Sequence, residues 1–277
     1  MHPHLTASDL ILSVLQIAER NAVSVALLIE VAGRFEVTSN NVRVALTRLV
    51  KRGLIHTPTT ASYRLADAAD PVRAYLETWR LGENRLREWN GTWLAIHLPA
   101  KPFSRSVRRQ SVNALTKLGL REARSLLWVR PDCLSDAMKP IEALAGLGLE
   151  SQAEPLWIEA RTELAQMWSS ALWDRQALAE QYADGLQALH DSHEQLQTLD
   201  SEATLVHAFH VGRRVIRQLG LDPLLPPSIV DADARAALTR AMLAYDDNAR
   251  RLWRDALASA NLSLPGIDKN AEPTHVA

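Results

Sequence analysis

Residues 24–65 read SVALLIEVAGRFEVTSNNVRVALTRLVKRGLIHTPTTASYRL, and this stretch decides the fold of the first part of the chain. Two short amphipathic segments of helical periodicity come first, and a hairpin follows whose second arm is 62–65. Gly53 ends the second helical pattern and leads into the hairpin. The order of helix, helix and hairpin predicts a winged helix-turn-helix.

The second helical segment, 40–52, has two chemically different faces. Thr38 or Ser39 stands where an N-cap is expected, directly before the periodic run. At about 100° per residue, one face is apolar and contains Val42, Ala45, Leu46 and Leu49. The opposite face contains Asn40, Arg43, Val44, Thr47 and Lys51, with Arg48 on its flank. The segment is therefore expected to be the recognition helix.

The chemistry of the exposed face favours DNA. Asn and Arg form paired hydrogen bonds with adenine and guanine edges in the major groove. Residues 34–64 hold six Arg and Lys residues against Glu36 alone, a local net charge of +5, whereas the whole chain carries −1. The alternative is an ordinary solvated helix face. The residues expected to contact base edges are Asn40, Asn41, Arg43 and Thr47, and those expected to contact phosphates are Arg48, Lys51, Arg52 and Arg64.

The length and composition indicate a folded protein of two or three domains, with 277 residues of which 47% are hydrophobic. A net charge of −1 excludes a general polyanion binder, so any nucleic-acid contact must be local. The single cysteine, Cys133, permits no internal disulfide and is expected in the core. We find neither a signal-peptide pattern nor an apolar run of membrane-spanning length, so a cytoplasmic location is the default expectation.

The periodicity predicts a mostly α fold with a small α+β part. Strand patterns at 92–98, 125–130 and 155–158 alternate with helical patterns at 105–118 and 134–145, which suggests a ferredoxin-like domain. From residue 162 onward the pattern is helical. The predicted organisation is a winged-helix domain at 1–66, a helical linker at 67–89, the α+β domain at 90–161, a helical domain at 162–265 and a loose tail at 266–277.

A row of basic side chains lies on one face of the helical pattern near residue 210. His207, His210, Arg214 and Arg217 are three or four residues apart, a spacing that suits a phosphate or carboxylate ligand. A solvated surface is the alternative. The pairs His190/His193 and His207/His210 lack an evident third ligand, so we predict no metal site. No dinucleotide, phosphate-loop, nucleophile-elbow or zinc-protease motif is present, so we predict no enzyme, no catalytic residue and no cofactor.

Four short motifs in order resemble the PaaX-type family of bacterial repressors of phenylacetate degradation. Tyr63-Arg64-Leu65 resembles the end of that family's wing, and Trp89-Asn90-Gly91-Thr92-Trp93-Leu94 resembles the opening of its middle domain. Leu172-Trp173-Asp174 with Leu178, Ala179 and Tyr182 is similar to a third family segment. Asp222-Pro223-Leu224-Leu225-Pro226 is similar to the fourth, a turn preceded by a helix with Arg at position 217.

The resemblance implies a winged helix, a middle domain similar to Cas2 proteins and a helical C-terminal domain. It also implies a homodimeric repressor of an aromatic-acid catabolic operon, such as one for phenylacetate. Such a repressor leaves its double-stranded DNA operator when an aryl-acyl-CoA thioester binds, for example phenylacetyl-CoA. The effector residues expected on this basis are Trp173, Tyr182, His207, His210, Arg214 and Arg217.

The chain also departs from the family pattern. Its wing tip, 57–62, lacks the family's Gly and Arg residues, position 90 is Asn where Asp is usual, and Val215 replaces an expected aromatic. Two other functions remain open at the level of sequence. One is an acyl-CoA-binding or enzymatic protein that uses its winged helix for protein contacts. The other is an architectural DNA-binding protein without a ligand.

Overall fold

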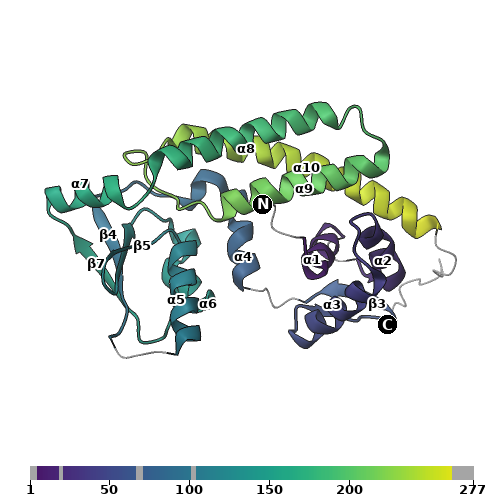
Figure 1. The fold of residues 1–277 in the computed structure, drawn as a ribbon, viewed down its shortest axis with the longest axis horizontal. Coiled ribbons are helices and arrows are strands. Elements are labelled where there is room, and N and C mark those ends of the chain that lie inside the picture. Colours follow the sequence, from purple (N-terminus) through teal and green to yellow (C-terminus); the bar gives the residue numbers. More distant parts are fainter. Residues whose placement is uncertain (1–4, 19–20, 67–70, 101–103, 264–277) are drawn as a thin grey trace, which may run out of the picture. The chain divides into compact units, whose positions relative to one another are not determined.

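The computed structural model describes residues 5–18, 21–66, 71–100 and 104–263, and it is mostly helical with two small antiparallel sheets (Figure 1). The chain divides into two compact units. The first comprises Met1–Ala69, Asp200–Val206 and Asp247–Ala277, and the second comprises Asp70–Leu199 and His207–Asp246. The mostly helical composition agrees with the fold class predicted from sequence.

The N-terminal part of the first unit consists of three helices and a three-stranded sheet. The helices are α1 (Ala7–Ile17), α2 (Val25–Gly33) and α3 (Ser39–Lys51), and they pack on one another through buried Leu, Ile and Val side chains. The strands are β1 (Val23–Ser24), β2 (Ile55–His56) and β3 (Ser62–Leu65), in the order β1-β3-β2. Strand β3 has the bounds that the sequence predicted for the second arm of the hairpin.

The second unit contains a four-stranded antiparallel sheet with the order β5-β6-β4-β7. Its elements follow along the chain as β4 (Thr92–His97), α5 (Arg105–Lys117), β5 (Arg121–Arg124), β6 (Leu127–Pro131), α6 (Pro140–Gly146) and β7 (Glu154–Glu159). Leu94 and Ile96 of β4 pack toward α5 and α6 on one face. Trp93 and Ala95 alternate with them and pack on the other face, against Trp168 of α7 (Thr162–Ala171).

Two elements of this region differ from the sequence prediction. Strand β5 was not predicted, because its sequence Arg-Glu-Ala-Arg has no apolar run and alternates between half-buried and exposed positions. The predicted helix at 134–145 is interrupted. A 3₁₀ turn, η2 (Asp136–Met138), is followed by Lys139 with φ 41°, and α6 begins only at Pro140. Proline has no backbone N–H and is favoured in the first turn of a helix, so it marks a start here.

Helices complete both units. Helix α4 (Pro71–Glu77) leads into the 3₁₀ segment η1 (Thr78–Arg85), which is kinked at Gly82. Helix α8 (Arg175–Gln195) has Asp174 as its N-cap and is followed by α9 (Ser201–Gly220) and α10 (Ala232–Ser263). Of the helices within the described ranges, none combines the length and apolar character needed to cross a membrane. The predicted tail at 266–277 and the first residues of the predicted linker, 67–70, lie outside the described residues.

The turn at 222–226 is held in the second unit by backbone contacts. Gly119 has φ +85°, and a Cβ atom there would lie 2.6 Å from the carbonyl oxygen of Pro223. The buried guanidinium of Arg130 donates hydrogen bonds to the carbonyl oxygens of Leu118 and Leu224. Because these contacts involve the backbone, they fix the path of the turn independently of most of its side chains.

Candidate nucleic-acid interface and ligand cavity

The start of α3 is fixed by its cap. The Thr38 hydroxyl accepts a hydrogen bond of 3.3 Å from the backbone N–H of Asn41, as expected for an N-cap. The four apolar residues predicted to face inward are buried, with Val42 and Leu49 at 0% exposure. Since these residues pack against α1 and α2, the rotation of α3 about its axis is determined, and its polar residues face away from the core.

The predicted DNA-contacting residues occupy this outer face. Seven of them are exposed, namely Asn40, Asn41, Arg43, Thr47, Arg48, Lys51 and Arg52, whereas Arg64 is half-buried on β3. Arg43, Arg48 and Lys51 form no ion pair with any residue that the structure describes. Three charges on this face are therefore not neutralised within the described chain, which is the condition for contact with phosphate.

The corner between α2 and α3 is anchored to later parts of the first unit. Arg34 forms ion pairs with Glu30 at 3.1 Å and with Glu202 of α9 at 3.5 Å. The ring of Phe35 stacks on Trp253 of α10 with centroids 6.1 Å apart. Arg34 contributed to the local charge of +5 counted from the sequence, but its charge is compensated by these two carboxylates. The Glu202 partner is distant in sequence, so only the fold reveals it.

The wing tip satisfies part of its own hydrogen bonding. The hydroxyls of Thr59 and Ser62 lie 2.5 Å apart, and Ala61 between them has φ 60°. A hydroxyl in such a pair keeps a lone pair that can accept a hydrogen bond, but at most one of the two protons remains available to a phosphate, because the Ser62 hydroxyl also lies within hydrogen-bond distance of the carbonyl oxygen of Thr59. The wing tip therefore has fewer free hydrogen-bond donors than its sequence suggests.

The two aromatic residues predicted to bind an effector are buried. Trp173 is 3% exposed, and its indole N–H donates to the carbonyl oxygen of Gly119 at 3.1 Å. Tyr182 is 1% exposed, and its hydroxyl donates to Oδ2 of Asp222 at 2.6 Å. Burial and the neighbouring Asp222 carboxylate raise the pKa of Tyr182. Both polar groups are already engaged, so neither side chain offers a free hydrogen-bonding surface to a ligand.

The predicted basic row on α9 is mainly a surface feature. His210, Arg214 and Arg217 are exposed, whereas His207 is half-buried, and its Nε2 atom is enclosed without a hydrogen-bond partner in the described part of the chain. The six residues predicted for the effector are thus not brought together on one accessible surface. Nor do any three His, Cys, Asp or Glu side chains of the described residues cluster as metal ligands would.

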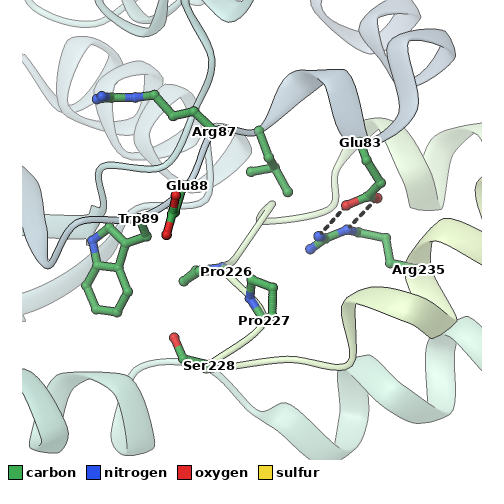
Figure 2. A pocket seen from close by; sticks show the side chains of 9 residues that line it. Glu83, Arg87, Glu88, Trp89, Pro226, Pro227, Ser228 and Arg235 are labelled. Atoms are coloured by element: carbon green, nitrogen blue, oxygen red, sulfur yellow. Dashed lines mark hydrogen bonds and ion pairs between the residues drawn. The ribbon is translucent and has the colours of Figure 1, made fainter.

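A cavity of about 450 Å³ lies elsewhere in the second unit, within the usual size range of small-molecule sites. Figure 2 shows the Trp89 ring and the Glu88 carboxylate on one side, and the Glu83–Arg235 ion pair on the other, while the Arg87 side chain points away. Pro226 and Pro227 lie between these groups. The lining residues are Glu83, Leu86, Arg87, Glu88, Trp89, Pro226, Pro227, Ser228 and Arg235.

Arg235 is the structural centre of one wall. Its guanidinium is fully buried and binds both carboxylate oxygens of Glu83 at 3.1 and 2.8 Å and the carbonyl oxygen of Leu225 at 2.9 Å. Burial opposes the charged form of Arg235, but the bond to Glu83 and the charge of Asp222 outweigh it and raise the pKa of the guanidinium. The ion pair therefore remains charged at neutral pH and fixes this wall.

Trp173 and Tyr182 do not line the cavity, but they are linked to residues that do. The Trp173 ring stacks on Trp93 at 6.3 Å, and Trp93 meets the cavity residue Trp89 edge-on at 5.4 Å. Asp222, which accepts from Tyr182, lies 3.9 Å from Nη1 of Arg235. Two sequence motifs thus converge here, since Trp89 belongs to the 89–94 motif and Pro226 to the 222–226 motif. Glu83 and Arg235 carried no sequence signal, because their pairing spans distant parts of the chain.

Comparisons with known proteins agree with the family resemblance and the fold. No curated protein matches the sequence significantly. Among solved structures, the uncharacterized protein Rv0674 from Mycobacterium tuberculosis is similar, with a TM-score of 0.62 and 24% identity, over 92% of this chain and 100% of that protein. This similarity shows a shared fold. Residues 6–69 match the model of the family described as PaaX-like protein. The match confirms, over those residues, the resemblance to PaaX-type proteins that the sequence motifs predicted.

Proposed function

We propose that this protein is a DNA-binding transcriptional regulator. In this proposal α1 to α3 and the sheet β1-β3-β2 form a winged helix-turn-helix, with α3 as its recognition helix. The observation that carries the proposal is the outer face of α3, where Asn40 and Arg43 are exposed beside cations that have no ion-pair partner among the described residues. The family match over residues 6–69 supports the same function.

The predicted assignment of contacts remains part of the proposal. Asn40, Asn41, Arg43 and Thr47 contact base edges, and Arg48, Lys51, Arg52 and Arg64 contact phosphates. The exposure of Asn40, Asn41 and Arg43 in the first half of α3 supports their role, because the N-terminal half of a recognition helix enters the major groove. Thr47 is exposed one turn after Arg43. The half-buried position of Arg64 on β3 limits it to the edge of the interface.

We further propose that the middle domain is ferredoxin-like and similar to Cas2 proteins. The order strand, helix, strand, strand, helix, strand and the sheet order β5-β6-β4-β7 support this assignment. The domain bounds predicted from sequence, 1–66, 67–89, 90–161 and 162–265, are kept in the proposal. The protein acts in the cytoplasm as a homodimer whose two winged helices bind the two halves of an operator.

The effector in this proposal is an aryl-acyl-CoA thioester, and the cavity beside Trp89 receives its acyl end. Leu86, Trp89, Pro226 and Pro227 supply apolar and aromatic walls for an aryl group. A CoA nucleotide is too large to enter as well, so its phosphates remain outside, and the exposed side chains of His210, Arg214 and Arg217 on the same unit are their proposed partners. Trp173 and Tyr182 act as supports of the cavity.

Repression and release require a difference in affinity. The thioester must bind the DNA-free conformation more tightly than the DNA-bound one. A ligand with equal affinity for both conformations does not change their relative populations. The regulated genes in the proposal form an aromatic-acid catabolic operon. The protein then represses that operon until the thioester accumulates.

A mobility-shift assay on DNA from upstream of the protein's own gene tests the proposal. We expect a shift that survives excess unrelated DNA and is reversed by phenylacetyl-CoA but not by free CoA. Trp89→Ala should retain the DNA shift and lose its reversal by phenylacetyl-CoA. Trp157→Ala is the control and should retain both, because Trp157 is 56% exposed and lies outside the cavity. A shift that is abolished by unrelated DNA would contradict regulation, and a thioester response unchanged in Trp89→Ala would contradict the cavity assignment.

A further inference from the structure

The outer face of α3 contains one apolar side chain in the middle of its polar residues. Val44 is 40% exposed, although the other exposed positions of the first two turns are polar or charged. It follows Asn40 by four residues and precedes Thr47 by three, so the three side chains are neighbours on the helix surface. Valine is also a weaker helix former than Lys, Arg, Gln or Glu at an exposed position. Neither local stability nor core packing therefore accounts for this valine.

Thr47 extends the apolar surface of Val44. Its hydroxyl donates a hydrogen bond of 3.0 Å to the carbonyl oxygen of Arg43, one turn earlier in the same helix. The proton of Thr47 is therefore used within α3, and the side chain offers an external partner its methyl group and the lone pairs of its oxygen, but no donor. The isopropyl group of Val44 and the methyl group of Thr47 form a small apolar contact surface beside Asn40 and Arg43.

We propose that Val44, together with the methyl group of Thr47, recognises the C5-methyl group of a thymine in the major groove. Among the groups that base pairs expose there, this methyl is the apolar one, and aliphatic side chains contact it in sequence-specific complexes. The inference rests on the proposed DNA-binding function and adds a specificity-determining residue to it. Val44 distinguishes thymine from cytosine or uracil at one position, whereas Asn40 and Arg43 supply the hydrogen bonds.

The structure offers a matched control. Val50 lies on the same helix and is 42% exposed, almost the same fraction as Val44. It lies in the last turn of α3, about 120° around the helix from Val44 and one turn beyond Thr47, away from the N-terminal half that is proposed to enter the groove. Substitution of either valine by alanine removes the same atoms and favours the helix slightly. If the two variants differ in DNA discrimination, the difference therefore results from the position of the valine on α3 and not from a change in stability.

Deoxyuridine in place of thymidine removes only the methyl group and tests the contact directly. Preferred duplexes are selected from a random pool with the full-length protein, and each thymine is then replaced singly by uracil. We expect that uracil at one or more positions weakens wild-type binding about fourfold, as for the loss of one buried methyl-sized group. At that position Val44→Ala should lose most of the discrimination between the two duplexes, and Val50→Ala should behave as the wild type.

Two substitutions at position 47 separate the methyl group from the hydroxyl. Thr47→Val should retain the discrimination against uracil, and Thr47→Ser should reduce it. Two results would overturn the role of Val44 and leave DNA binding intact. In one, the wild type prefers thymine over uracil at no position of the selected duplex. In the other, the wild type and Val44→Ala discriminate equally between thymine and uracil. A failure to select any preferred duplex would instead overturn the proposed function, and the role of Val44 with it.

Discussion

The hydroxyl of Tyr182 donates a hydrogen bond of 2.6 Å to Oδ2 of Asp222, and both side chains are buried. Tyr182 belongs to α8, and Asp222 begins the 222–226 turn that forms part of the cavity wall. Oδ1 of Asp222 accepts a hydrogen bond of 2.8 Å from the backbone N–H of Leu224 and lies 3.9 Å from Nη1 of Arg235. One carboxylate therefore connects α8, the turn and α10.

Tyr182→Phe should destabilise the protein by about 1–3 kcal/mol, because it leaves Oδ2 of a buried carboxylate without its donor. The measurement is the free energy of unfolding from urea denaturation followed by circular dichroism. DNA binding by folded protein should be unchanged, because the substitution lies in the other compact unit from α3. A loss of less than about 0.5 kcal/mol would show that the hydrogen bond does not stabilise the turn.

Stability should fall when the pH rises above about 10, where tyrosine in an unfolded chain loses its proton. Burial raises the pKa values of Tyr75, Tyr182 and Tyr245, so the folded state retains protons that the unfolded state releases. Their contribution is complete below pH 10 and is lost as the pH rises further. Urea midpoints measured between pH 8 and pH 11 should show this decline, with a smaller decline in Tyr182→Phe. If the absorbance showed that all four tyrosines had become phenolates while the circular dichroism was still that of the folded protein, the raised pKa values of the buried tyrosines would be contradicted.

Gly119→Ala should be strongly destabilising, whereas Gly91→Ala should cost only about 1–2 kcal/mol. Both glycines have a left-handed backbone, with φ +85° and +92°, so both alanines carry the cost of that conformation. At position 119 the new Cβ atom would also meet the backbone of Pro223 at 2.6 Å, but at position 91 it meets nothing within 4 Å. Thermal unfolding of the two variants gives the comparison, and equal losses would contradict the close approach at Gly119.

Much of the DNA-binding region was predictable because its signals are local. A cap at Thr38 or Ser39, the buried residues Val42 and Leu49 and the arm at 62–65 all follow from neighbouring residues in the sequence, and the structure places the cap at Thr38. The pairing of Arg34 with Glu202 was not predictable, since it depends on a helix about 170 residues away. For the same reason, the sequence overestimated the uncompensated charge of this region.

The ligand site was less accessible to sequence reasoning. Periodicity located Trp173 and Tyr182, but it could not distinguish a residue that lines a cavity from one that supports its wall. The pairing of Glu83 with Arg235 across 152 positions had no local signal. Strand β5 was also missed, because a short strand of charged residues at a sheet edge lacks the apolar alternation from which strands are predicted.

Lys51→Ala should weaken binding to all DNA sequences by a similar factor and reduce the slope of log affinity against log salt by about one. Lys51 is exposed and has no ion-pair partner among the described residues, so a phosphate is its expected partner. Lys139→Ala provides the control, because Lys139 pairs with Glu142 at 3.1 Å in the other compact unit. Fluorescence anisotropy at several salt concentrations gives both slopes, and identical slopes for the two variants would remove Lys51 from the interface.

The most direct test of DNA recognition by α3 is the site preference of Arg43→Ala. The ratio of affinities for the selected duplex and a scrambled duplex is measured by anisotropy at constant salt, with Arg34→Ala as the control because Arg34 is paired within the protein. We predict that Arg43→Ala loses about 1–3 kcal/mol of discrimination while Arg34→Ala retains it. An unchanged ratio in Arg43→Ala would contradict the assignment of α3 as the recognition helix.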